Sequence, residues 1–247
     1  MDLKERQQHA QRHPWEVARA RHFRRLVAGT FPAPPTTVID IGAGDGWFAE
    51  QLRADLAPGS SIVCVDANYS ADDLAQRLPD GIVRRTVPPE HAARLVLALD
   101  VLEHIDEDRE FVAEQLAPLV APDGFLIASV PAHQRLFTSH DVALGHHRRH
   151  SSASLRALLE PSFEVVHEGS LFTTLLPPRA ASALLERVRP PQGEPSVDSE
   201  WRGGPLISRS ITTVLDADAR LGRLLADRPR RLPGLSVWAV CRPMVAE

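Results

Sequence analysis

The sequence contains few cysteines, few aromatic residues and a single lysine. Its two cysteines, Cys64 and Cys241, lie in separate apolar runs, so the sequence offers neither a disulfide framework nor a C-x-x-C metal motif. Free thiols in such runs favour a reducing compartment, and we expect a cytoplasmic protein. The polar residues 1–13 lack the apolar stretch of a signal peptide.

Long apolar runs and a strong net charge are missing as well. No apolar run approaches the roughly 20 residues that a membrane-spanning helix needs, so we expect no stable membrane insertion. The formal net charge of −4 gives no overall attraction to nucleic acid. A chain of 247 residues is long enough for one large α/β domain with an insertion.

Short apolar runs alternate with helical patterns, as expected for βαβ units around a parallel sheet. The predicted strands are 37–41, 61–66, 95–100, 124–130, 163–170 and 233–242. The predicted helices are 1–28, 46–56, 70–78, 107–120, 151–159, 171–186 and 206–226. Pro177 and Pro178 are expected to interrupt the helix that contains them, and the polar segment 187–205 is predicted to be a loop or lid.

A glycine-rich turn follows the first predicted strand. The run VIDIGAGDGWF leads from an apolar strand through Gly42, Gly44 and Gly46 into a helical pattern. Glycine at such positions permits positive φ and a close approach of a ligand to the backbone. Asp66, at the end of the next predicted strand, is placed to accept hydrogen bonds from the two hydroxyls of a ribose. Together these features predict a site for an adenosine-containing cofactor.

Two classes of adenosine cofactor compete for this turn. The dinucleotide fingerprint G-x-G-x-x-G has a third glycine where this sequence has Trp47. Here the pattern is G-x-G-x-G, and Asp40 stands near the end of the preceding strand. A negative charge at that place suits the ammonium group of a methionine moiety better than a pyrophosphate. The pattern favours a methionine-derived cofactor over NAD(P), and a turn that only packs helix on sheet is the alternative.

Four segments, VIDIGAGDG, IVCVDAN, LALDVLEHI and PDGFLIASVPA, resemble the successive motifs of class I S-adenosylmethionine-dependent methyltransferases. The resemblance spans residues 36–170, and the last strand follows after an insertion. It implies an α/β fold with a Rossmann-like, seven-stranded, mostly parallel sheet, helices on both faces and an antiparallel last strand. It also implies S-adenosylmethionine as the cofactor.

The same resemblance assigns cofactor contacts. They are Asp40, Gly42, Gly44 and Gly46 at the methionine part, Asp66 at the ribose, Ala67 and Asn68 beside the adenine, and Asp100 and Val101 at the end of the fourth strand. Many relatives carry an acidic residue before the fourth strand that binds the adenine amino group. The segment IVRRTVPPEHAA offers no counterpart, and Thr86 or a backbone carbonyl is the expected substitute.

On this basis the chain divides into four parts. Residues 1–35 form an N-terminal helix with a proline-rich connector, and residues 36–170 form the cofactor-binding core. Residues 171–232 are expected to form a helical cap over the acceptor site. Residues 233–247 return the last strand to the core.

The loop after the predicted strand 124–130 is rich in histidine. Its sequence VPAHQRLFTSHDVALGHHRRHS, like HPWEVAR near the N-terminus, resembles a subgroup of small bacterial methyltransferases. We predict His140 as catalytic base with Asp141 as its orienting partner, and His147 as the second candidate. The alternative is that these side chains hold the loop together. Arg148 and Arg149 are predicted either to clamp an acidic substrate or to form a solvated basic turn.

Asp100, Glu103 and His104 offer three potential ligands for a divalent metal. Some quinone-precursor O-methyltransferases resemble this D-x-x-E-H pattern and use a metal, whereas L-E-H-I is common in metal-free relatives. We therefore expect no metal. The apolar faces of the predicted cap helices suit a hydrophobic or aromatic acceptor, or pack on the sheet.

The predicted function is methylation of a small molecule at a hydroxyl oxygen, because a hydroxyl needs a base more than a neutral amine does. The alternatives are a small-molecule N-methyltransferase, a non-catalytic cofactor-binding relative, an RNA methyltransferase and an NAD(P)-dependent oxidoreductase. The net charge and the lack of an N-P-P-Y motif after the fourth strand argue against RNA, so we expect a small-molecule acceptor and no nucleic acid partner. No pattern in the sequence indicates the oligomeric state.

Overall fold

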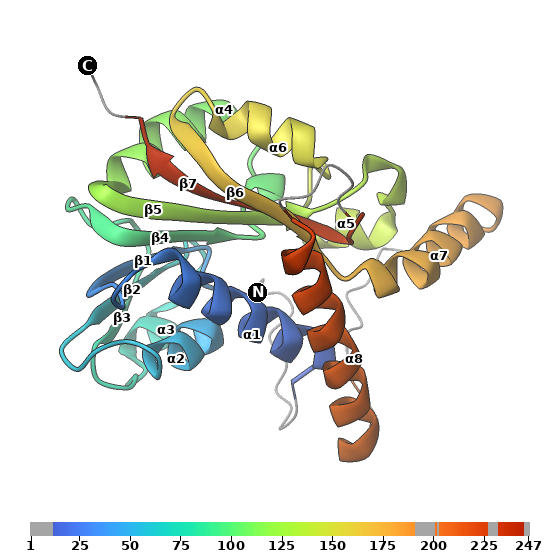
Figure 1. The fold of residues 1–247 in the computed structure, drawn as a ribbon, viewed down its shortest axis with the longest axis horizontal. Helices are drawn as coiled ribbons and strands as arrows, with labels where there is room; N and C mark the ends of the chain where they lie inside the picture. Colours follow the sequence, from blue (N-terminus) through green and yellow to red (C-terminus); the bar gives the residue numbers. More distant parts are fainter. Residues whose placement is uncertain (1–11, 191–200, 202, 227–231, 245–247) are drawn as a thin grey trace.

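One seven-stranded sheet forms the centre of the molecule in the computed structural model, which describes residues 12–190, 201, 203–226 and 232–244 (Figure 1). The strands are β1 (Thr37–Ile41), β2 (Ser61–Val65), β3 (Ile82–Arg85), β4 (Ala93–Leu99), β5 (Val120–Pro131), β6 (Phe163–Leu171) and β7 (Ser236–Pro243). Their order is β3-β2-β1-β4-β5-β7-β6, and only the pairs that include β7 are antiparallel. The predicted mostly parallel sheet with an antiparallel last strand is confirmed.

Helices cover both faces of this sheet. They are α1 (Pro14–Thr30), α2 (Trp47–Arg53), α3 (Ala71–Ala75), α4 (Asp108–Glu110), α5 (Ser139–Leu144), α6 (Ser152–Leu159), α7 (Leu176–Val188) and α8 (Pro205–Leu224). One apolar core lies between the sheet and α1, α2 and α8, and a second lies between the opposite face and α6 with the helical turns that follow α4. Because β1, β2 and β4 are covered on both faces, nearly all their residues are buried, which explains their continuous apolar sequences.

Two elements were not among the sequence predictions. β3 is an edge strand whose sequence, IVRR, contains two arginines, and Val83 is 48% exposed, so it lacks the apolar run that marks the inner strands. α5 lies within the segment predicted to be a loop, and Thr138 with Asp141 forms a capping box at its start. The other six strands were all among the ranges predicted from the sequence.

Two predicted helices differ from the observed ones. Pro177 and Pro178 begin α7 instead of interrupting a helix, because the first turn of a helix has backbone N–H groups without helical partners and tolerates proline. The predicted helix 107–120 is α4 followed by a π-helical turn (Phe111–Leu116) and a 3₁₀ turn (Ala117–Leu119). Residues 1–11, 191–200, 202, 227–231 and 245–247 of the predicted helices, loop, cap and last segment lie outside the described residues.

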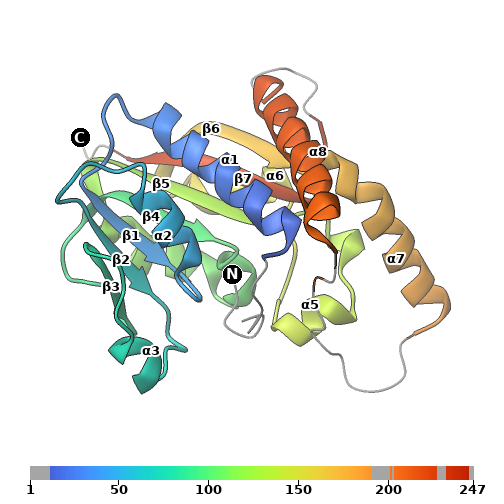
Figure 2. The same ribbon diagram turned by 90° about the horizontal axis from the view of Figure 1, so that it is seen from below.

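α8 lies alongside α1 on one face of the sheet (Figure 2). Leu215 and Ala219 bury the middle of α8 in the core, and the Asp216 carboxylate pairs with Arg21 at 3.0 Å and Arg25 at 3.3 Å. The first turn of α8 is different, since Leu206 is 80% exposed. A cap over the acceptor site formed by residues 171–232 stays a prediction.

Neither membrane crossing nor disulfide bonding is indicated within the described part of the chain. None of its helices has the length and apolarity needed to cross a bilayer. Cys64 and Cys241 are buried free thiols on β2 and β7.

Candidate active site

The glycine turn between β1 and α2 adopts a backbone that other residues rarely reach. Gly42, Gly44 and Gly46 have φ of 65°, 57° and 79°. At Gly42 a Cβ atom would lie 2.5 Å from Cγ2 of Val101, which follows β4. The turn is therefore tight against the end of β4, and glycine at position 42 is required by both its backbone angle and its neighbour.

Asp66 connects this turn to the end of β2. Its Oδ2 accepts a hydrogen bond from the Gly44 N–H at 3.1 Å, and its Oδ1 accepts one from the Asn68 N–H at 2.9 Å. These two backbone donors fix the carboxylate at the carboxyl end of the sheet. In open α/β sheets the ligand crevice lies at this end, where the predicted ribose contact of Asp66 is expected.

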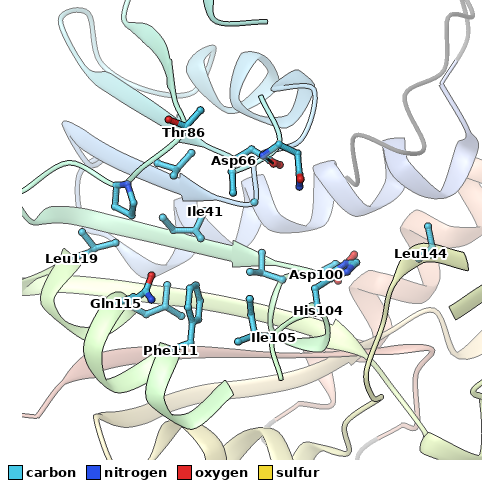
Figure 3. A pocket seen from close by; sticks show the side chains of 17 residues that line it. Ile41, Asp66, Thr86, Asp100, His104, Ile105, Phe111, Gln115, Leu119 and Leu144 are labelled. Atoms are coloured by element: carbon cyan, nitrogen blue, oxygen red, sulfur yellow. Dashed lines mark hydrogen bonds between the residues drawn. The ribbon is translucent and has the colours of Figure 1, made fainter. Parts of the chain in front are cut away.

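A cavity of about 330 Å³ opens beside Asp66 (Figure 3). Six of the predicted cofactor contacts line it: Gly42, Asp66, Ala67, Asn68, Asp100 and Val101. Figure 3 shows Asp66 and Thr86 on one side of the cavity, with Ile105, Phe111 and Gln115 on the other. Its volume falls within the range of small-molecule sites, roughly 300–1,000 Å³. The cavity is thus the candidate cofactor pocket.

Three of the predicted contacts, Asp40, Gly44 and Gly46, do not line this cavity. Asp40 is 3% exposed. Burial raises the pKa of the Asp40 carboxyl to about 7, while the positive charge of Arg19 acts in the opposite direction. An ammonium group bound nearby would favour the ionised carboxylate.

Thr86 and Gln115 add polar side chains to the lining of the cavity, which also includes Ala67 and Asn68. Thr86 comes directly after β3, and Gln115 belongs to the π-helical turn. Thr86 was expected to substitute for the missing adenine-binding acid, and its place in the cavity is compatible with that role. Gln115 was not predicted, because its segment carries no motif.

Asp100, directly after β4, has an unusual backbone conformation. Its φ of 61° lies in the left-handed region, which costs a non-glycine residue on the order of 1–3 kcal/mol and is typical of functional sites. Arg19 of α1 donates from Nη2 to the Asp100 carboxylate at 2.8 Å, and the Ser129 hydroxyl donates to its other oxygen at 3.2 Å. Arg19 was missed as a site residue, although it lies in the HPWEVAR segment that carried the second resemblance.

Asp141 is the centre of the histidine-rich loop. Its side chain is fully buried and accepts hydrogen bonds from Arg149 Nε at 2.7 Å, Arg179 Nη2 at 2.9 Å and the Thr138 N–H at 2.9 Å, and its Oδ1 lies 3.0 Å from His146 Nδ1. Burial alone would raise the pKa of Asp141, but the hydrogen bonds from His146 and Arg149 outweigh it and hold the pKa below its ordinary value of 3.8. The imidazole that Asp141 orients is therefore that of His146.

The predicted catalytic histidines lie on either side of this centre. His140 is half-buried, and burial, followed by the charge of Arg179, lowers the pKa of its imidazole and so favours the neutral ring. His147 is half-exposed, with Nδ1 3.7 Å from Asp106 Oδ1. Neither lines the cavity. Their catalytic roles, and that of Asp141, stay predictions.

The two arginines of the loop form internal ion pairs. Arg148 donates to the carboxylates of Asp108 at 2.9 Å and Asp106 at 3.1 Å, while Arg149 pairs with Asp141. Both arginines therefore help to hold the loop, and a substrate clamp formed by Arg148 and Arg149 stays a prediction.

Glu103 and His104 form a 3₁₀ turn (η2, Leu102–His104) directly after Asp100. His104 lines the cavity, and its ring packs edge-on against His146 with centroids 4.6 Å apart. Burial, and next the charge of Asp100, raise the pKa of the Glu103 carboxyl well above its ordinary value. The end of β4 and the loop after β5 thus meet at the edge of the cavity.

A turn of three left-handed glycines, an acid directly after the second strand and a cavity at the carboxyl edge of a parallel sheet are typical of α/β proteins that bind a nucleoside cofactor. The sequence profile of the methyltransferase domain matches residues 9–168, more than half of the chain. The chain belongs to this methyltransferase-domain family, and S-adenosylmethionine is its cofactor. The recognition of a class I methyltransferase from its motifs is confirmed.

Solved structures share the fold at low sequence identity. The N-methyltransferase NodS from Bradyrhizobium japonicum WM9 is 13% identical with a TM-score of 0.52, over 93% of this chain and 97% of that one. A SAM-dependent methyltransferase from Archaeoglobus fulgidus is 18% identical with a TM-score of 0.50, over 92% and 93%. The [4+2]-cyclase SpnF is 15% identical with a TM-score of 0.56, over 94% and 84%. No curated protein matches the chain in sequence.

Substitution of Asp66 by alanine is expected to weaken binding of S-adenosylhomocysteine about 10- to 100-fold, as the loss of hydrogen bonds to a charged group costs about 1.5–3 kcal/mol. Calorimetric titration measures the affinity, and a melting curve checks the fold. Asp72→Ala, which removes an exposed acid from the first turn of α3, is the matched control and should bind normally. Unchanged affinity in Asp66→Ala would remove the ribose assignment.

Proposed function

We propose that the protein transfers the methyl group of S-adenosylmethionine to a hydroxyl oxygen of a small, hydrophobic or aromatic molecule. The observation that carries this proposal is the cluster of Glu103, His104 and His146, of which His104 lines the cofactor cavity. The methyl group of a sulfonium is already activated, so the protein mainly has to place the acceptor in line with it. A hydroxyl acceptor must also lose its proton, and this cluster supplies groups suited to that task.

The chemistry of the cavity wall supports an apolar acceptor. Between the strand ends and α5 the cavity is bordered by Ile105, Phe111 and Leu144. Apolar walls with a few polar groups are typical of sites for small organic ligands. The exposed Leu184 and Leu185 of α7 would add apolar surface if the predicted cap lies over the acceptor.

The remaining parts of the proposal rest on charge and composition. With a net charge of −4, the chain has no overall attraction to a phosphate backbone, which supports a small molecule over RNA as acceptor. A cytoplasmic location is supported by the two buried free thiols.

The test is a methyl-transfer assay on the purified full chain with S-adenosylmethionine, comparing phenols and alcohols with primary amines of similar shape. We expect S-adenosylhomocysteine to be released with hydroxyl acceptors. Turnover with amines alone would show that the acceptor atom is nitrogen. Two structures that share this fold, NodS and coclaurine N-methyltransferase, are named as N-methyltransferases. Cofactor binding without turnover on any acceptor would favour a non-catalytic relative, and binding of NADH instead would contradict the proposal.

A further inference from the structure

Three potential metal ligands come together where the end of β4 meets the loop after α5. One ligand atom each from Glu103, His104 and His146 lies within 4.8 Å of the other two. Ligands that share one ion at 2.0–2.2 Å lie at most about 4.4 Å apart, so side-chain adjustments of a few tenths of an ångström complete the set. Two of the residues belong to one 3₁₀ turn, and the third comes from a distant segment that the fold brings beside it.

The Glu103 carboxyl is the strongest sign that this cluster has a ligand. Its side chain is 0% exposed, and neither oxygen accepts a hydrogen bond from another described residue. A buried polar group without a partner costs free energy, and native proteins almost always satisfy such groups. A cation bound to one of its oxygens would give this carboxylate the partner it lacks.

His146 is held in the orientation of a metal ligand. Its Nδ1 lies 3.0 Å from Asp141 Oδ1, which leaves Nε2 available for the cluster. A carboxylate that fixes the far nitrogen of a histidine is the usual support of a metal-bound imidazole. The Asp141 carboxylate is itself held in place by hydrogen bonds from Arg149, Arg179 and the Thr138 N–H.

Asp100 is not part of this set, although the sequence pattern grouped it with Glu103 and His104. Both of its carboxylate oxygens are engaged, one by Arg19 and the other by Ser129. The third potential ligand beside Glu103 and His104 is therefore His146 and not Asp100. The donor set consists of two imidazoles and one carboxylate.

In contrast to the metal-free site expected from the sequence, we propose that Glu103, His104 and His146 bind one divalent first-row transition metal ion beside the cofactor cavity. Imidazole ligands favour ions such as Zn²⁺, Fe²⁺ or Co²⁺ over Mg²⁺ and Ca²⁺. Three protein ligands leave a coordination position open. Its role deepens the proposed function and depends on it: an acceptor hydroxyl bound at the open position would lose its proton to water more readily, because the ion stabilises the resulting alkoxide or phenoxide.

The test is calorimetric titration of the full chain, treated with a chelator and dialysed, with zinc chloride, repeated with cobalt chloride under visible absorption. We expect one ion per chain and a Co²⁺ spectrum of a low-coordinate site. Glu103→Gln and His146→Ala should each weaken metal binding by more than about 10-fold, and Asp141→Asn by roughly 10- to 100-fold. His91→Ala, an exposed histidine that precedes β4, is the control and should bind the metal normally.

Titration of the same samples with S-adenosylhomocysteine separates this inference from the proposed function. Wild-type protein that binds S-adenosylhomocysteine but neither metal overturns the inference, as does metal binding that survives both Glu103→Gln and His146→Ala. Metal binding that these substitutions abolish, in a protein that methylates no hydroxyl, supports the site and contradicts only the proposed reaction.

Discussion

Replacing Asp141 by asparagine is expected to lower the free energy of unfolding by about 3–5 kcal/mol. The two side chains have the same shape, so the change removes charge without opening a cavity. It leaves Arg149, whose side chain is 6% exposed, and Arg179 without their shared counter-ion. Urea denaturation followed by circular dichroism measures the loss. A change below about 1 kcal/mol would show that the loop is not anchored by this carboxylate.

Asp106→Asn is the matched control. Asp106 also pairs with an arginine and a histidine of the same loop, but its side chain is 75% exposed. Exposed ion pairs contribute about 0–1 kcal/mol, so this variant should unfold almost as the wild type does. The comparison isolates burial as the cause of the difference.

The effect of Asp141→Asn should depend on pH. Because the pKa of Asp141 is lower in the folded chain than its ordinary value of 3.8, its ionised form stabilises the fold at all pH values above 3.8. That contribution is lost as the pH falls through the lower, folded-state value. The stability difference between wild type and Asp141→Asn is therefore constant near neutral pH and shrinks in acid below about pH 4.

Replacing Gly42 by alanine is expected to weaken binding of S-adenosylhomocysteine on the order of 100-fold, which corresponds to about 2.8 kcal/mol. An alanine at φ 65° carries a strain of about 1–2 kcal/mol. Its Cβ would also lie 2.5 Å from Val101 Cγ2, so the turn or the end of β4 must move. Both border the cavity, and calorimetry therefore detects either movement as a loss of affinity.

Two further variants test whether the loss of affinity comes from position 42 and from its contact with Val101. Gly29→Ala is a control in α1, where a Cβ meets nothing within 4 Å, and it should keep full affinity with a stability gain of up to about 1 kcal/mol. Val101→Ala in the Gly42→Ala background removes the conflicting methyl group and should recover part of the affinity. Full wild-type affinity in Gly42→Ala alone would mean that the turn does not shape the cofactor pocket.

The parts of the fold that the sequence predicts are those whose burial leaves a repeating pattern. β1, β2 and β4 are buried on both faces and appear as apolar runs, and the glycines between β1 and α2 mark left-handed backbone. β3 was not predicted from the sequence, because an edge strand needs only one covered face and can carry arginines. A strand is recognisable in a sequence through the apolar residues that it buries, so a strand that buries few of them is missed.

The candidate site likewise contains some residues that the sequence predicts and others that it does not. Asp66 was predicted because its position after a strand has a geometric meaning in this fold. The partner of Asp141 was not predicted, since His140 is adjacent in sequence and His146 becomes adjacent only when α5 ends at Gly145 and the chain turns back. Arg19 reaches Asp100 from a helix far away in sequence. Such contacts depend on side-chain directions that no local pattern encodes.

The position of β7 between β5 and β6 has a consequence for how the chain folds. β6 makes its ladder only with β7, which lies beyond α7 and α8 in the sequence. During synthesis β5 therefore presents an open apolar edge, and β6 has no strand to pair with, until the segment 236–243 has left the ribosome. Unpaired edges of this kind invite association with other chains. Closure of the sheet by one late strand makes assembly of this half of the molecule a slow, non-local step, whereas β1, β2 and β4 can join as they emerge.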